Sequence, residues 1–248
     1  MIYIKPQLPD PRFTCIVTAV QLKHEPDATA ALRRVALLRG LTPAALVRLA
    51  AAATLLNLPR GKPLCRNGER CAGLYIVVSG RIMMSVGESP GARKVIELLG
   101  PGDHVGLAAA VHGVPEAFAA ETLTDSMLLL IPRAALLECA ANNAGFALQL
   151  VGALSRQVCG LIADIEAFTL RSGRERVANY LLQSATAGSA QPRPITLPAK
   201  KSIIASRLSL TPEYFSRMLH ELIAAGVITV NGRQIIVHDP GRLHDTGR

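Results

Sequence analysis

Residues 200–221 read KKSIIASRLSLTPEYFSRMLHE, and their pattern indicates how the C-terminal part of the chain folds. Ser209 stands where two short helices would meet in a tight turn, a place where Gly is more usual. Thr211 is a good N-cap and Pro212 suits the first helical position, so we expect the second helix to begin at about Pro212. The apolar residues fall where two crossing helices bury side chains: Ile204, Leu208, Leu210, Phe215 and Met218. The pattern predicts a helix-turn-helix.

The second helix of this motif carries Glu213, Ser216 and Arg217 on its outward face, because residues three and four apart are neighbours on a helix. These residue types hydrogen-bond to base edges in the major groove of DNA. An exposed ion pair between Glu213 and Arg217, worth at most about 0.5 kcal/mol, would be an ordinary feature of a surface helix. Within a helix-turn-helix, the three side chains instead predict base reading.

Two β-rich runs, 227–230 and 234–237, follow around Asn231 and Gly232, a strong two-residue hairpin signal. This pattern predicts a wing with Arg233 at its tip, well placed for a phosphate. Phosphate contacts add salt-dependent affinity without sequence choice. The candidates for such contacts are Lys200, Lys201, Arg207, Thr211 and Arg233.

The segment 195–237, with its LTPEYFSRML helix, resembles the winged helix-turn-helix of the Crp/Fnr family of bacterial transcription regulators. Between residues 58 and 132, short apolar runs alternate with Gly-containing turns, which predicts a β-barrel or double-sheeted roll. LYIVVSGRI and LLGPGDHVG in this region resemble the cyclic-nucleotide-binding roll of the same family. The resemblance implies an α+β regulator, and the arrangement of Glu213, Ser216 and Arg217 is most similar to the Fnr-like, nitrogen-oxide-responsive branch.

Residues 142–170 are predicted to form one long helix with an a/d seam sustained over more than two heptads. A seam this narrow favours a partner helix from a second copy, although packing on the chain's own roll is the alternative. Its residues are Val151, Leu154, Val158, Leu161, Ile165 and Phe168. The resemblance then implies a homodimer that reads a palindrome of TTGAT-like half-sites in double-stranded DNA, with RNA polymerase as a further partner.

Four segments follow from these patterns. We expect an N-terminal extension (1–27), a β-roll sensor domain with flanking helices (28–141), a dimerisation helix (142–170) and the DNA-binding domain (171–248). From residue 170 onward there are 11 Lys or Arg and 5 Asp or Glu, so most of the net charge of +9 lies where a polyanion would bind.

Other classes of protein are disfavoured by the composition. No apolar run approaches the roughly 20 residues of a membrane span, and the N-terminus lacks a signal-peptide core, so we expect a cytoplasmic protein without a membrane partner. The six His are scattered, and neither HxxxH nor CxxC spacing occurs, so we expect neither an enzyme nor a metal site.

The roll lacks the residues that hold the ligand in the cyclic-AMP receptors it resembles. In the cyclic-AMP receptors that the roll resembles, a Gly-Glu pair and an Arg-Ser or Arg-Thr pair about ten residues later hold the ligand. Here Leu107 replaces the Glu, and Ala117 and Phe118 stand near where the Arg and the hydroxyl would be. We therefore expect no tight binding of cyclic AMP. We also expect no iron–sulfur cluster, because a cluster needs four thiolates and only Cys15 precedes Cys65.

Haem is the remaining cofactor that the resemblance suggests, and haem-mediated sensing of nitric oxide is the leading hypothesis for the signal. His104 and His112 are candidate ligands, with His24 in the extension. The alternative is a regulator that needs no effector, or that a protein partner controls, with the roll as a scaffold only. Cys65 is expected to pack inward, with a redox pair between Cys65 and Cys71 as the alternative.

Overall fold

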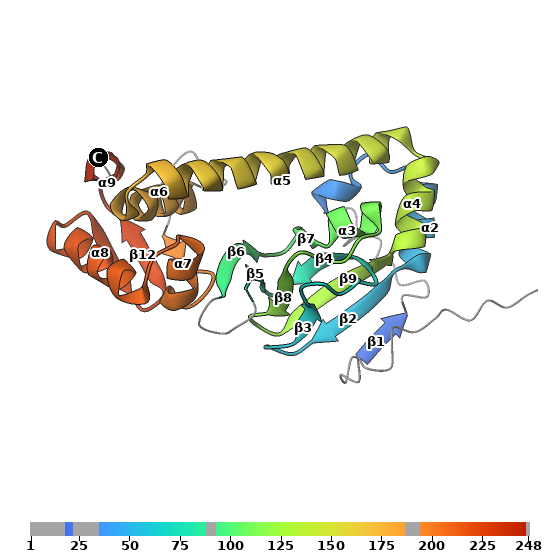
Figure 1. The fold of residues 1–248 in the computed structure, drawn as a ribbon, viewed down its shortest axis with the longest axis horizontal. Coiled ribbons are helices and arrows are strands. Elements are labelled where there is room, and N and C mark those ends of the chain that lie inside the picture. Colours follow the sequence, from blue (N-terminus) through green and yellow to red (C-terminus); the bar gives the residue numbers. More distant parts are fainter. Residues whose placement is uncertain (1–17, 22–34, 88–92, 187–193, 247–248) are drawn as a thin grey trace, which may run out of the picture. The chain divides into compact units, whose positions relative to one another are not determined.

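The computed structural model describes residues 18–21, 35–87, 93–186 and 194–246 (Figure 1). The chain forms two compact units. The first comprises Met1–Ile82 and Leu99–Leu154, and the second comprises Met83–Leu98 and Ser155–Arg248. The segment Met83–Leu98 thus belongs to the same unit as the C-terminal helices, although it lies within the predicted roll. The four segments expected from the sequence remain predictions.

Antiparallel strands build the roll. One sheet has the order β1-β2-β9-β4-β7, made of Thr18–Gln21, Thr54–Leu58, Ser126–Pro132, Gly73–Ser79 and His104–Val105. The other has the order β3-β8-β5-β6, made of Pro63–Cys65, Ala119–Thr122, Ile82–Val86 and Lys94–Leu99. Strand β4 is buried along most of its length because it pairs with β9 on one side and with β7 on the other. These sheets confirm the double-sheeted roll predicted from the spacing of apolar runs and turns.

Helices cover the core of the first unit. They are η1 (Ala36–Leu38), α2 (Pro43–Ala52), α3 (Leu107–His112) and α4 (Arg133–Ala141). Helix α2 begins where Thr42 accepts a hydrogen bond from the Ala45 amide at 3.2 Å and Pro43 takes the first helical position. Among the side chains that close this core are Leu74, Ile76, Ile131, Leu136 and Phe146, all completely buried.

Helix α5 (Ala144–Leu170) is a single helix of 27 residues, as the seam predicted. Four of the six seam residues, Val151, Val158, Leu161 and Ile165, are more than half exposed. Leu154 instead packs against the core of the first unit, and Phe168 is half-buried. Of the described helices, α5 alone is long and apolar enough to cross a membrane, by length and composition only.

The C-terminal part of the second unit is a winged helix-turn-helix. Its helices are α6 (Gly173–Thr186), α7 (Lys201–Arg207), α8 (Pro212–Ala224) and α9 (Pro240–Thr246). Its sheet has the order β10-β12-β11, made of Ile195–Thr196, Gln234–Val237 and Ile228–Asn231. The predicted hairpin is confirmed, but Asn231 pairs with Gln234, so the two loop residues are Gly232 and Arg233 rather than Asn231 and Gly232.

Candidate nucleic-acid interface

A Schellman turn joins the two helices of the helix-turn-helix. The Leu210 amide donates to the Ala205 carbonyl at 2.9 Å, and the Ser209 amide donates to the Ser206 carbonyl at 3.1 Å. This geometry places Ser209 in the left-handed region at φ 55°, where a Gly usually stands. Ser209 is the only residue other than Gly with positive φ in the described part of the chain. The turn predicted at Ser209 is therefore confirmed.

Helix α8 begins as its sequence predicts. The Thr211 side chain accepts a hydrogen bond from the Tyr214 amide at 3.2 Å, and Pro212 occupies the first helical position. Glu213 lies in the first turn, where the helix dipole stabilises a negative charge. The inward face of α8 packs into the domain through Phe215, Met218, Leu219 and Leu222, which are buried.

The opposite face of α8 presents the three side chains predicted to read bases. Glu213 and Arg217 are exposed and Ser216 is half-buried. Arg217 does not pair with Glu213; its Nε lies 3.9 Å from Glu221 Oε1, one turn further along. Its guanidinium also lies over the Tyr214 ring, 4.9 Å from the centroid. These two contacts restrain a side chain that is still 63% exposed, so its donors remain available.

Tyr214 and Glu221 are contributions that the sequence analysis missed. Their spacing from Arg217, three residues before and four after, places all three on one face of α8 and was the available signal. Arg174 of α6 also donates to Glu221, at 2.5 Å. No sequence signal pointed to Arg174, since 47 residues separate it from Glu221.

The five residues predicted to contact phosphates differ in the hydrogen bonds and ion pairs that their side chains already make. Lys200 and Lys201 are exposed at the start of α7. Arg233, at the tip of the wing, donates from Nε and Nη2 to the Leu197 carbonyl at 3.1 and 2.5 Å. Arg207 forms a two-point ion pair with Asp164 at 2.9 and 3.0 Å. Thr211 Oγ1 is occupied as the N-cap of α8.

In the receptors that the roll resembles, an Arg-Ser or Arg-Thr pair binds the phosphate. Near the corresponding position this chain has a buried acid, Glu116. Leu107, at the position of the missing Glu, is buried. Glu116, ten residues after Gly106, is only 4% exposed, and its Oε1 has no hydrogen-bond partner among the described residues. Burial raises the pKa of Glu116, while a hydrogen bond with the Cys71 thiol lowers it. Neither Glu116 nor Leu107 supplies a cation that could pair with a phosphate.

The thiols of Cys65 and Cys71 lie beside Glu116. Cys65 is buried at the end of β3, as expected, and Cys71 is half-buried. Hydrogen bonding with the Cys65 side chain and burial both raise the pKa of Cys71. Both thiols are free. Because the thiolate is the reactive form of cysteine, these surroundings favour an unreactive, structural pair.

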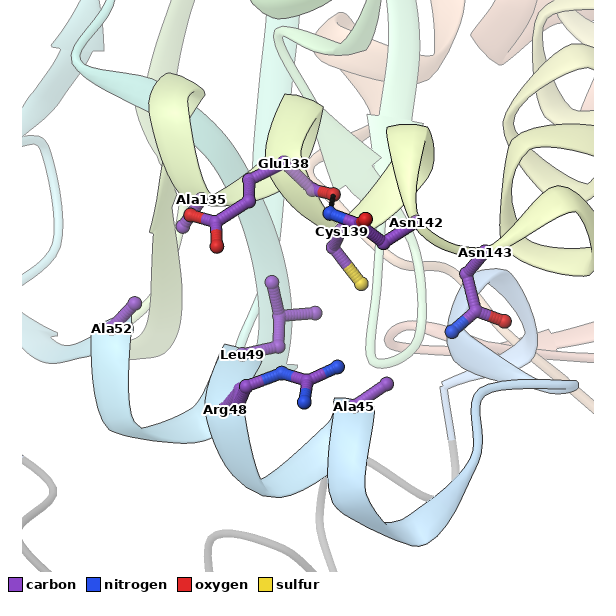
Figure 2. A pocket seen from close by; sticks show the side chains of 9 residues that line it. All are labelled: Ala45, Arg48, Leu49, Ala52, Ala135, Glu138, Cys139, Asn142 and Asn143. Carbon is purple, nitrogen blue, oxygen red and sulfur yellow. Dashed lines mark hydrogen bonds between the residues drawn. The ribbon is translucent and has the colours of Figure 1, made fainter.

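His104 and His112, proposed as haem ligands, line neither of two cavities in the described residues. A cavity of about 450 Å³ lies between α2 and α4, where Arg48 and Leu49 face Glu138 and Cys139 (Figure 2). A second, of about 350 Å³, lies between α6 and α8. Neither cavity has a histidine in its wall, since His104 lies in β7 and His112 is exposed at the end of α3. The other two residues considered for cofactor binding, His24 and Cys15, lie outside the described residues.

A β-roll and a winged helix-turn-helix with an exposed second helix, carried on one chain, define a DNA-binding transcription regulator. Residues 55–143 match the family described as "Cyclic nucleotide-binding domain", and residues 175–246 match "Crp-like helix-turn-helix domain". The chain belongs to the Crp/Fnr family of transcription regulators.

Relatives from several branches of this family are similar to the chain. It is 24% identical to a "CRP-like cAMP-activated global transcriptional regulator" of Mycobacterium tuberculosis, over 86% of this chain and 96% of that protein. It is 25% identical to the "Fumarate and nitrate reduction regulatory protein" of Vibrio cholerae, over 75% of each. The solved structure of FixK2 from Bradyrhizobium japonicum superposes with a TM-score of 0.71, at 27% identity, over 79% of this chain and 98% of that one. The near-equal identities do not single out one branch.

Proposed function

We propose that the protein is a homodimeric, sequence-specific regulator that reads a palindromic, TTGAT-like site in double-stranded DNA. The observation that carries this proposal is the outward face of α8, where Glu213, Ser216 and Arg217 stand opposite a fully buried face. An exposed second helix of this kind can enter the major groove and place its N-terminal residues against base edges.

The three side chains supply complementary chemistry. Arg217 donates to O6 and N7 of a guanine, and Glu213 accepts from the exocyclic amine of a cytosine or an adenine. Ser216 adds a contact to a thymine or a neighbouring base. The Tyr214 ring and the Glu221 carboxylate support this assignment, because they limit the rotamers of Arg217 before DNA arrives.

Phosphate contacts add affinity without sequence choice. Lys200 and Lys201 are exposed cations beside the motif. Arg233 and Thr211 lie at the wing tip and at the start of α8, where a backbone phosphate would pass. Arg207 completes the set once its pairing with Asp164 is broken.

Pairing of two chains through α5 brings two recognition helices to one palindrome. The exposed residues Val158, Leu161 and Ile165 are spaced three and four apart, which is the spacing that one helix presents to another. Two half-sites about one DNA turn apart match a dimer with a twofold axis. Such a regulator works in the cytoplasm with RNA polymerase as its partner.

The roll is the part of the protein that would sense the signal controlling DNA binding. Glu116 and Leu107 favour a roll that has lost the binding of cyclic nucleotides, so the signal must be of another kind. Haem and nitric oxide remain a hypothesis from the Fnr-like resemblance alone, and an absorption spectrum of the protein mixed with haem tests it directly. The second candidate is a regulator that binds DNA without an effector. It is favoured by the buried side chains at the former ligand position, and tight specific binding by cofactor-free protein would establish it.

The base-reading assignment is tested by comparing Arg217→Ala with Lys201→Ala on cognate and random duplexes. Arg217→Ala should weaken cognate binding by about 1–3 kcal/mol and leave random binding nearly unchanged. Lys201→Ala should weaken both alike and reduce the salt slope by about one. Equal losses on both duplexes for Arg217→Ala would contradict the assignment.

A further inference from the structure

The C-terminal end of α7 is held by a strand of the roll segment that belongs to the same compact unit. Lys94, the first residue of β6, donates from Nζ to the carbonyls of Ser206 and Arg207 at 2.5 and 3.0 Å. The Val95 amide donates to Ser206 Oγ at 3.0 Å. Strand β6 is thus bonded at three points to the last turn of the first helix of the helix-turn-helix.

This contact uses the carbonyls at the end of α7, of which the Ser206 carbonyl also accepts from the Ser209 amide. The last carbonyls of an α-helix have no partner within the helix, and the helix dipole makes that end negative. The Lys94 ammonium supplies both the hydrogen bonds and the opposite charge. It also lies 4.3 Å from the centre of the Phe168 ring, so Lys94 contacts α5 as well as α7.

The same cluster also holds the Arg207 guanidinium. Two of its nitrogens lie 2.9 and 3.0 Å from the two carboxylate oxygens of Asp164 in α5. Both side chains are only about a quarter exposed, so water screens this pair less than a surface pair. The charged groups that face Lys94 from the surrounding elements are Arg207, Asp164 and Arg176.

We propose that Lys94 and Asp164 form an autoinhibitory clamp that withholds Arg207 of α7 from the DNA backbone. This inference rests on the proposed function, because it takes DNA as the ligand. While the clamp is closed, the guanidinium is committed to Asp164 and the end of α7 is fixed to β6. When it opens, one more cation reaches a phosphate and α7 is free to move with α8.

Asp164→Asn tests the clamp, since it removes the charge that holds Arg207 and keeps the shape of the side chain. Specific and random duplexes should both be bound about eightfold more tightly at 0.1 M salt, with a salt slope steeper by about 0.9, as one added phosphate contact gives. The double variant Asp164→Asn/Arg207→Met should lose this gain. An unchanged slope in Asp164→Asn, or a gain that persists in the double variant, would overturn the clamp.

Arg207→Met in the otherwise unchanged protein is the matched control. If Arg207 is withheld, this substitution should change affinity less than twofold. A loss as large as that of Lys201→Ala would show that Arg207 already contacts DNA, which would also overturn the clamp. If the unsubstituted protein and all variants fail to bind any duplex, it is the proposed function that fails.

Lys94→Met is read out without DNA, by amide hydrogen exchange of the full-length protein. Amides at the end of α7, residues 204–210, should exchange about tenfold faster in this variant. The control is Arg60→Met, which removes an exposed cation from the loop between β2 and β3. It should leave the exchange of these amides unchanged. Ser206→Ala, which removes the bond to Val95, should act in the same direction as Lys94→Met. Unchanged exchange in both Lys94→Met and Ser206→Ala would refute the attachment of β6 to α7.

Discussion

Replacing Ser209 by Gly should stabilise the protein, although it removes a side chain. Ser209 occupies the left-handed position of a Schellman turn at φ 55°. A residue with a Cβ costs roughly 1–2 kcal/mol of stability in that region. A Gly costs about 0.5–1 kcal/mol of stability because the unfolded chain gains entropy. Both backbone hydrogen bonds of the turn survive the change, so the difference favours Gly by about 0.5–1 kcal/mol. For a chain of this length that corresponds to a rise in Tm of about 1–4 °C.

Denaturant unfolding followed by the circular dichroism of the helices measures this difference. Ser202→Gly is the matched control: Ser202 is exposed within α7, and the same change there should cost about 0.5–1 kcal/mol. The two substitutions therefore have opposite expected signs. If Ser209→Gly lowers the unfolding midpoint as Ser202→Gly does, the reasoning from backbone strain is wrong.

Two further predictions concern Lys94 and α5. Burial and the nearby Arg207 lower the pKa of Lys94 from 10.5 to about 8, so the unfolded chain binds more protons between these values. The free energy of unfolding, relative to Lys94→Met, should therefore rise from pH 8 to 10.5 and stay flat below pH 8. A relative free energy that falls over this window, measured by denaturant titration at several pH values, would contradict the assigned shift. Leu161→Glu should raise the dissociation constant of the dimer by roughly a hundredfold in analytical ultracentrifugation, because it buries a charge at the helix pairing. Val47→Glu, on the half-exposed face of α2, is its control and should leave the protein dimeric. Equal effects of the two would place the interface elsewhere.

The sequence predicted those features whose cause is local. Thr211 and Pro212 start α8 because a cap and a fixed φ act within one turn, and the wing forms around its hairpin signal. Contacts between distant segments were not predictable in this way. The bond from Lys94 to Ser206 spans 112 residues, and the ion pair of Arg207 with Asp164 spans 43. No periodic pattern in the sequence predicts contacts between residues so far apart in the chain.

The seam and the roll show two other limits of sequence patterns. A heptad pattern marks an apolar face but does not say what covers it, and Leu154 and Phe168 turned out to have partners within their own chain. Position alone suggested Ala117 and Phe118 as the replacements for the phosphate-binding pair. The structure instead buries Glu116 there. Its side chain lies beside Gly106 and Cys71, which come from other parts of the roll, so its burial could not be predicted from position alone.

The attachment of β6 to α7 has a practical consequence for protein engineering. A chimaera that transplants residues 171–248 onto a foreign sensor would leave Lys94, Val95 and Asp164 behind. The transplanted module would lack the Lys94 hydrogen bonds at the end of α7 and would carry an Arg207 without its ion pair. Such a hybrid should behave as a deregulated binder, whereas one that also carries 83–98 and 155–170 should keep the restraint of the parent.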